Sequence, residues 1–362
     1  MYLALRDIRF AKGRFALMGS VVALITLLLV LLSGLTAGLG NQNTAALKGF
    51  SGAGITTIAF GAPPGSDAKI SYTESSVTQE QLSGWRETPG VRSAEPVGIT
   101  QTRIMGGASA NVAVFGVEPG SALPPQPVPD GQILVGAETA ESLGLAAGDT
   151  ASLAGRTLKV AAVVEETFYS HTPVAWTSLA TWQQAAHTAD AGPGPAPVAT
   201  VIAASVSDDA AGRADDTAGT VSASVRNSFS GLGAYTSENG SLLLMQAFLY
   251  GISALVIVAF LAVWTIQRTR DIAVLKALGA SSGYVMRDAL AQAGIIVAAG
   301  AVVGGVLAVL AGWAAGQAAP FVLSAATAAL PVLGTILLGL AGAAAAVRRV
   351  VKVDPLTALG GN

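Results

Sequence analysis

One charge-free stretch near the C-terminal end most constrains how this chain can fold. Between Ala289 and Val347 the sequence has no Asp, Glu, Lys or Arg, whereas about a quarter of the residues of a typical soluble domain are charged. The chain of 362 residues follows the same trend, with 52% hydrophobic and 12% charged residues. So long a stretch without charge is stable only where water is excluded, and the composition therefore indicates an integral membrane protein.

Four segments are long and apolar enough to cross a bilayer. A hydrocarbon core about 30 Å thick requires roughly 20 apolar residues in a helix that rises about 1.5 Å per residue. The predicted spans are residues 15–39, 242–266, 289–318 and 321–347. The first span also has the basic flank of a secretory signal peptide, but its apolar run exceeds the roughly 7–15 residues of such a signal. We therefore expect four transmembrane helices.

The distribution of charge predicts the orientation of the spans. The segment 40–241 holds 9 Lys and Arg against 18 Asp and Glu, and the remainder of the chain holds 11 against 4. Basic clusters at residues 6–14, 268–287 and 348–352 adjoin the ends of the spans, and Lys and Arg are retained on the cytoplasmic side. Both termini are thus expected in the cytoplasm, and the segment 40–241 outside it.

The outer segment is predicted to be a mixed α+β domain. Alternating apolar and polar runs typical of half-buried strands begin at Gly54, Ala110, Arg156 and Ala199, and a short helical run begins at Ala137. The fold class that follows is an α-helical membrane protein with four transmembrane helices and a large α+β extracytoplasmic domain between helices 1 and 2. The chain has no cysteine, so this domain must be stabilised without disulfides.

Small residues recur four positions apart within three of the spans. The pairs are Gly34 and Gly38, Gly300 and Gly304, and Gly312 and Gly316. This spacing lets membrane helices approach closely, which is how they pack when no hydrophobic force drives them together. A composition that is rich in Gly and Ala is the alternative explanation.

The cytoplasmic segments have amphipathic patterns. Residues 1–14 place apolar side chains on one helical face and basic ones elsewhere, which predicts a helix at the membrane surface. A basic flank that only sets the topology is the alternative. The loop 267–288 contains a second short amphipathic helix, which would dock on a soluble partner or fold back on the membrane domain. The tail, residues 348–362, completes the cytoplasmic part.

The sequence lacks the motifs of common catalytic sites. No GxxxxGK[ST] phosphate loop occurs, so ATP would have to be bound by another subunit. The only histidines, His171 and His187, lack the spacing of zinc ligands. We expect no enzymatic activity, and neither a cofactor nor a metal of the chain's own.

Three stretches resemble one family of membrane proteins. They are RTRDIAVLKALGAS in the cytoplasmic loop, ILVGAETAESLGLAAGDTASLAGRTLKVAAVV in the outer segment and KVDPLTALGG in the tail. They are similar to ABC transporter permeases of the MacB and FtsX type, and the resemblance extends over nearly the whole chain. It implies a homodimer in the lipid bilayer that binds two copies of a separate ABC ATPase. It also implies a mechanotransmission cycle, in which ATP binding draws the two permease subunits together. The resemblance implies no nucleic-acid partner.

The same resemblance gives the cytoplasmic loop a role as a coupling helix against the ATPase. The residues that carry this expectation are Asp271, Ile272, Leu275, Lys276, Leu278, Gly279, Ala280 and Ser281. ATP would be bound and hydrolysed by the partner, and the permease would transmit the resulting movement across the membrane.

Two further stretches look most like Hrt-type haem-exporting permeases of Gram-positive bacteria. They are LRDIRFAKGRFALMG at the start and SFSGLGAYTSENGSLLLMQAFLYG before the second span. This resemblance implies haem as the exported cargo and the plasma membrane of such a bacterium as the location. Haem iron is held by His, Met, Cys or Tyr. The candidate haem-binding residues are Tyr235, Glu238 and Met245 near the second span, and Tyr169 and His171 in the outer domain.

Each candidate residue also has a structural interpretation. Tyr235 fits the aromatic belt at the membrane interface, Glu238 a solvated helix start, and Met245 ordinary packing. Tyr169 and His171 equally fit loop or core positions of the outer domain. Two other functions suit the same architecture, namely export of a lipid, lipoprotein or peptide antibiotic, and an FtsX-like scaffold that activates a cell-wall hydrolase.

Overall fold

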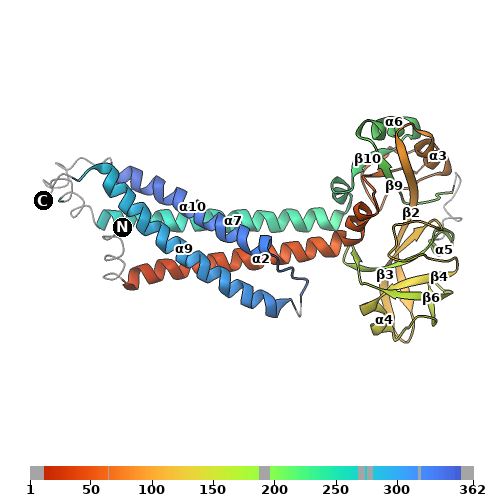
Figure 1. Ribbon diagram of the computed structural model, residues 1–362, viewed down its shortest axis with the longest axis horizontal. Coiled ribbons are helices and arrows are strands. Elements are labelled where there is room, and N and C mark those ends of the chain that lie inside the picture. Colours follow the sequence, from red (N-terminus) through yellow and green to blue (C-terminus); the bar gives the residue numbers. More distant parts are fainter. Residues whose placement is uncertain are drawn as a thin grey trace. The chain divides into compact units, whose positions relative to one another are not determined.

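The computed structural model describes residues 12–63, 65–186, 196–267, 274, 280–316 and 319–351. The chain divides into two compact units, Gly40–Asn239 and the remainder, which we call the inserted domain and the membrane unit. Its four long helices are α2 (Lys12–Gly52), α7 (Gly233–Gln267), α9 (Ser282–Ala315) and α10 (Ala325–Val351) (Figure 1). Of the expected surface helix at residues 1–14, residues 1–11 lie outside the described residues and 12–14 are the start of α2. Of the expected tail at residues 348–362, residues 352–362 lie outside the described residues and 348–351 are the end of α10.

Each of the four long helices contains a segment that is long and apolar enough to cross a membrane. Among the described residues these segments are Phe15–Gly52, Gly233–Phe260, Met286–Ala315 and Ala325–Ala346. The expected fold class, four membrane helices with an α+β domain between the first and the second, is confirmed. α2 remains helical beyond residue 39, and α7 begins before residue 242. Both polar extensions lack proline, so nothing in them interrupts the helices.

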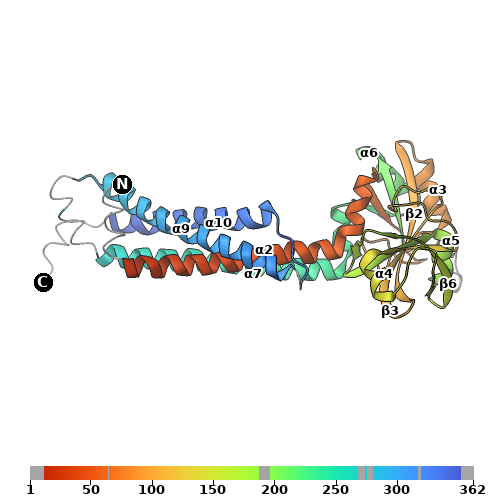
Figure 2. The same ribbon diagram turned by 60° about the horizontal axis from the view of Figure 1, so that its bottom comes forward.

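Glycines bring α9 against α2 within the membrane unit, where the two helices cross in both views (Figures 1 and 2). A Cβ atom at Gly300 would lie 2.7 Å from the carbonyl oxygen of Gly19. A Cβ atom at Gly304 would collide with the carbonyl group of Ala23. The two backbones are therefore in direct contact, and this supports packing as the reason for the four-residue spacing of these glycines.

The connection between α9 and α10 closes the same interface at its other end. The ring of Phe321 covers Gly34 of α2 and Gly312 of α9, at positions where a Cβ atom would overlap the ring. The backbone N–H of Val322 donates to the carbonyl oxygen of Gly34 at 3.1 Å. α2, α9 and the connection thus form one packed group.

The inserted domain is built on one mixed sheet. Its strands are β1 (Thr57–Phe60), β2 (Val91–Met105), β3 (Ser109–Val117), β4 (Gln132–Gly136), β5 (Thr150–Leu153), β6 (Arg156–Val164), β7 (Phe168–Tyr169), β8 (Thr172–Ser178), β9 (Val201–Val206) and β10 (Val221–Ser224). Its helices are α3 (Gln79–Glu87), α4 (Ala137–Leu143), α5 (Leu179–Ala185), α6 (Asp208–Ala218) and the 3₁₀ helix η2 (Asn227–Gly231).

The strand order is β10-β1-β9-β2-β3-β8-β4-β6-β5, and β7 pairs with β8. β2 also pairs with β5, through Ile104 with Leu153 and Met105 with Ser152. This additional pairing closes β2, β3, β8, β4, β6 and β5 into a small barrel, while β10, β1, β9 and the first half of β2 form an open sheet. The strands expected from alternating sequence correspond to β1, β3, β6 and β9, and the expected helix is α4.

The open sheet is covered by α3 and α6. Trp85 of α3 is fully buried against strand residues such as Ile202, and its indole Nε1–H donates to Thr220 Oγ1 at 2.8 Å. The capping box of Thr78 and Gln81 defines where α3 begins, since each side chain bonds the other residue's backbone N–H. Burial of this tryptophan therefore joins the helical layer to the sheet.

Asp215 covers the outer edge of β10. Its carboxylate accepts hydrogen bonds from the Ser222 backbone N–H at 3.0 Å, the Ser222 hydroxyl at 2.6 Å and the Thr220 hydroxyl at 2.7 Å. β10 ends the sheet, and the unpaired groups of an edge strand are a template for pairing with other chains. Burial raises the pKa of Asp215 above its ordinary value, although the Ser222 and Thr220 bonds act in the opposite direction.

The raised pKa of Asp215 predicts a pH-dependent stability. An acid whose pKa is raised by folding stabilises the protein fully below its unfolded-state pKa, and this stability is lost as the pH rises through the folded-state value. Relative to Asp215→Asn, the wild-type chain should therefore lose stability as the pH rises from about 4 towards neutrality. Thermal unfolding of both full-length proteins in detergent measures this difference, and parallel curves of Tm against pH would contradict it.

Candidate functional site

Tyr235 and Glu238 lie on the first turns of α7. A separation of three residues places two side chains on the same helical face. The ring of Tyr235 is half-buried and makes an edge contact with Phe229, with 5.9 Å between ring centroids. The side chain of Glu238 is 38% exposed. The start of α7 thus presents a phenol and a carboxylate close to each other.

His171 meets Glu238 although 67 positions separate them in the sequence. Its Nε2 lies 2.9 Å from Oε1 and 2.9 Å from Oε2 of Glu238. Its Nδ1 lies 3.3 Å from Gln42 Oε1. The Asn43 amide Nδ2 lies 2.9 Å from His171 Nε2 and donates to Glu238 Oε2 at 3.1 Å. The cluster therefore joins α2, α7 and the β7–β8 turn.

Gln42 and Asn43 were not identified as site residues from the sequence. They belong to the polar run Asn41–Gln42–Asn43, which directly follows the apolar part of α2. A run of three amides at the end of a membrane span is an indication of polar contacts. Only the fold brings this run to His171, because 128 positions separate Asn43 from the histidine.

Tyr169 lies in the aromatic core of the inserted domain. It is 5% exposed, and its ring makes edge contacts with Tyr72 and Phe115 at centroid distances of 5.8 and 5.3 Å. Burial, with a smaller contribution from Tyr72, raises the pKa of the Tyr169 phenol far above its ordinary value. Binding of iron by tyrosine requires the phenolate, so this position favours the core interpretation of Tyr169 over a cargo-binding role.

Met245 is part of α7 within the membrane unit. Its side chain is 54% exposed and belongs to an apolar face with Leu244 at 59% and Phe248 at 63%. α7 buries only 11% of its apolar span, compared with 44% for the spans of α2 and α9. Among the described helices, α7 therefore offers an extensive apolar surface for lipid, cargo or another protein.

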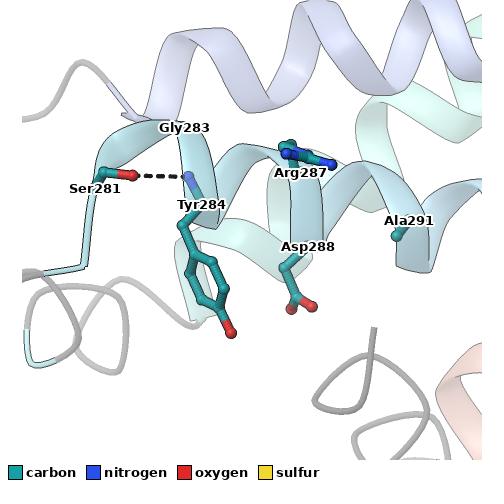
Figure 3. Close-up of a pocket in the computed structure, with 6 residues that line it drawn as sticks. All are labelled: Ser281, Gly283, Tyr284, Arg287, Asp288 and Ala291. Atoms are coloured by element: carbon teal, nitrogen blue, oxygen red, sulfur yellow. Dashed lines mark hydrogen bonds between the residues drawn. The ribbon is translucent and has the colours of Figure 1, made fainter.

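The described part of the loop 267–288 adjoins a pocket. Asp271, Ile272, Leu275, Lys276, Leu278 and Gly279 lie outside the described residues, whereas Ala280 and Ser281 are described. Ser281 caps α9 and accepts a hydrogen bond from the Tyr284 backbone N–H at 3.2 Å. A pocket of about 700 Å³ is lined by Ser281, Gly283, Tyr284, Arg287, Asp288 and Ala291. Figure 3 shows the Tyr284 and Asp288 side chains on the same side of α9.

Two family models match this chain. The MacB-like periplasmic core domain matches residues 15–218, and the FtsX-like permease C-terminal region matches residues 242–355. With four apolar helices and an inserted α+β domain, these matches define a multi-pass membrane permease of an ABC transporter. The chain belongs to the MacB/FtsX family. Membership of an ABC transporter permease family implies an ATPase partner.

Curated relatives align over the full length. The chain is 25% identical over 370 residues to the hemin transport system permease protein HrtB of Staphylococcus epidermidis, covering 100% of both chains. It is 27% identical over 375 residues to an ABC transporter permease of Mycobacterium tuberculosis, covering 100% of this chain and 99% of the relative. Among solved structures, the periplasmic region of MacB from Actinobacillus actinomycetemcomitans matches with 10% identity and a TM-score of 0.34, over 48% of this chain and 90% of that one.

Proposed function

We propose that this chain is the permease subunit of an ABC exporter that expels haem from the membrane of a Gram-positive bacterium. The observation that carries the proposal is the arrangement on α7, where Tyr235 and Glu238 precede the exposed apolar residues Leu243 and Leu244 on one helix. The full-length similarity to HrtB of Staphylococcus epidermidis supports the same cargo. Both termini would lie in the cytoplasm and the inserted domain outside it.

The chemistry of haem matches the residues at the start of α7. Haem is an apolar macrocycle with an iron centre, so its binding requires an apolar surface and a side chain that can hold iron. Tyr235 offers a phenol oxygen and Glu238 a carboxylate, while Leu244, Met245 and Phe248 offer the apolar surface. Met245 could also hold iron through its thioether. His171 would act on this site through Glu238.

ATP would drive export through the partner subunit. The resemblance to MacB and FtsX permeases supports a homodimer with two ATPase copies, in which ATP binding draws the two permeases together. The cytoplasmic loop, including Ala280 and Ser281, would contact the ATPase, and the pocket at the start of α9 lies directly after it. The exposed apolar face of α7 is available for contact with a second copy of the chain.

A substitution in this pocket tests the contact with the ATPase. Gly283 lines the pocket, and its surroundings leave room for a side chain, since Ser281 Oγ is 3.9 Å from a Cβ built at this position. Gly283→Trp should therefore fill the pocket without disturbing the chain, and should reduce copurification of the partner ATPase by about tenfold or more. Gly212→Trp is the control, because a Cβ there meets no atom within 4 Å. Equal recovery with both variants would refute the contact.

A haem titration of the detergent-purified chain tests the cargo. We expect a saturable shift of the Soret absorbance, and a Kd raised by about tenfold or more in Tyr235→Phe and in Glu238→Ala, as expected for loss of one charge-assisted contact. Tyr284→Phe is the matched control, because Tyr284 is an exposed tyrosine on α9. Saturable binding that neither variant weakens would mean that haem binds at a different site on the chain. Absence of saturable binding would refute haem as the cargo and favour export of a lipid, lipoprotein or peptide.

A further inference from the structure

The turn between β7 and β8 has a strained backbone. Ser170 and His171 have φ angles of 48° and 61°, in the left-handed region that glycine adopts freely and other residues rarely adopt. Tyr169, immediately before the turn, is buried in the aromatic core and fixes that end of the hairpin. A strained conformation of this kind persists only where neighbouring contacts hold it.

Main-chain contacts with α2 hold the turn from one side. The Ser170 N–H donates to the carbonyl oxygen of Asn43, and the His171 N–H donates to that of Gln42, each at 3.1 Å. Both carbonyl groups lie within α2, and a carbonyl oxygen that already accepts a helical bond has a second lone pair. The turn can therefore bind to α2 without breaking the helix's own hydrogen bonds.

The imidazole ring of His171 holds the turn from the other side, through Glu238 of α7. His171 Nε2 lies 2.9 Å from each of the two carboxylate oxygens of Glu238, so the ring contacts both oxygens. The side chains of His171 and Glu238 are 31% and 38% exposed. A molecule from outside can therefore reach the same carboxylate that fixes the ring.

We propose that the β7–β8 turn is a strained latch, closed by the His171–Glu238 contact, that opens when a cargo group takes over the Glu238 carboxylate. The opening step rests on the proposed function, since it requires cargo at Glu238, whereas the closed latch does not. Once the ring is released, the main-chain bonds, the buried Tyr169 and the Thr172 hydroxyl, which donates to the Ser170 carbonyl oxygen, are left to hold the two left-handed residues. β8 pairs with β3 and β4, so opening would transmit occupancy of the α7 site to the barrel.

Hydrogen exchange at the Ser170 and His171 amides reports the state of the latch, because both N–H groups donate to α2 when it is closed. The measurement uses the full-length chain in detergent, by mass spectrometry, without and with haemin. Without haemin, Glu238→Ala and His171→Ala should each speed this exchange by about tenfold, as expected for loss of one charge-assisted hydrogen bond. Ser170→Gly retains the N–H and relieves the strain, so it should slow the exchange.

The Val160 amide is the internal reference, because it donates to Asp149 within the barrel at 2.8 Å. Saturating haemin should speed exchange at the turn in wild type and have no further effect in Glu238→Ala. Saturable haemin binding without any change at the turn would overturn the opening step and leave the proposed function intact. Absence of haemin binding would overturn the proposed function and the opening step together. Exchange that is unchanged in Glu238→Ala and His171→Ala without haemin would overturn the latch itself.

Discussion

Gly304→Leu is expected to unfold the membrane unit at a markedly lower temperature than wild type. Even the Cβ atom of the new side chain would collide with the Ala23 carbonyl group, so α9 and α2 would have to separate. Inserting one oversized side chain into a packed interior typically costs about 1–3 kcal/mol. The cost here should reach the upper end of that range or exceed it, because a backbone rather than a flexible side chain opposes the insertion.

The neighbouring position provides the control for this variant. Val303 is 53% exposed, so Val303→Leu adds volume to a surface that faces away from the interior of the described unit. Thermal unfolding in one detergent should show a lower Tm for Gly304→Leu and no comparable decrease for Val303→Leu. Equal Tm values for the two variants would mean that α2 and α9 do not pack through their glycines.

Trp85→Ala is expected to destabilise the open-sheet half of the inserted domain severely. The side chain is fully buried and donates a hydrogen bond to Thr220 at 2.8 Å. Truncating a buried Trp costs about 3–5 kcal/mol, out of a total stability of about 5–15 kcal/mol for a typical domain. The cavity left between α3 and the sheet contributes, and so does the loss of the indole donor to Thr220 Oγ1, although the Thr220 hydroxyl still donates to Asp215 at 2.7 Å.

Limited proteolysis of the full-length chain measures this loss, because cleavage within α3, β1 and β9 requires local unfolding. Trp313→Ala is the matched control, as Trp313 is 71% exposed on α9. We expect rapid cleavage of the inserted domain in Trp85→Ala and wild-type resistance in Trp313→Ala. Wild-type resistance in both variants would show that Trp85 does not hold α3 and α6 on the sheet.

The membrane helices were predictable because their signal is local. A run of apolar residues identifies a span without knowledge of any other part of the chain. The polar ends of α2 and α7 were less predictable, because residues 40–52 and 233–241 are helical without being apolar. β1, β3, β6 and β9 followed from alternation, which is equally local.

Local sequence patterns could predict neither the closure of the barrel nor β2, the longest strand. β2 contains Pro96, and proline ordinarily argues against a strand. The structure accommodates it in the first half of β2, which pairs with β9 on one side, whereas pairing with β3 begins at Gly98. Closure of the barrel depends on β2 meeting β5 across the sequence, and no local pattern encodes such a pairing.

In the candidate site, too, some residues follow from local sequence, whereas their contacts depend on the fold. Tyr235 and Glu238 could be named as candidates because they lie just before a predicted span. The partners of His171 could not, since Gln42, Asn43 and Glu238 come from distant parts of the sequence. The burial of Tyr169 depends on Tyr72 and Phe115, which belong to other segments of the inserted domain.

The length of β2 has a mechanical consequence for the inserted domain. Its first half pairs with β9 in the open sheet, and its second half with β3 and β5 in the barrel. One continuous backbone thus belongs to both halves, without a linker between them. A force applied to the barrel would reach the open sheet through covalent bonds and ladder hydrogen bonds, so the inserted domain should behave as a single stiff lever rather than as two bodies joined by a hinge.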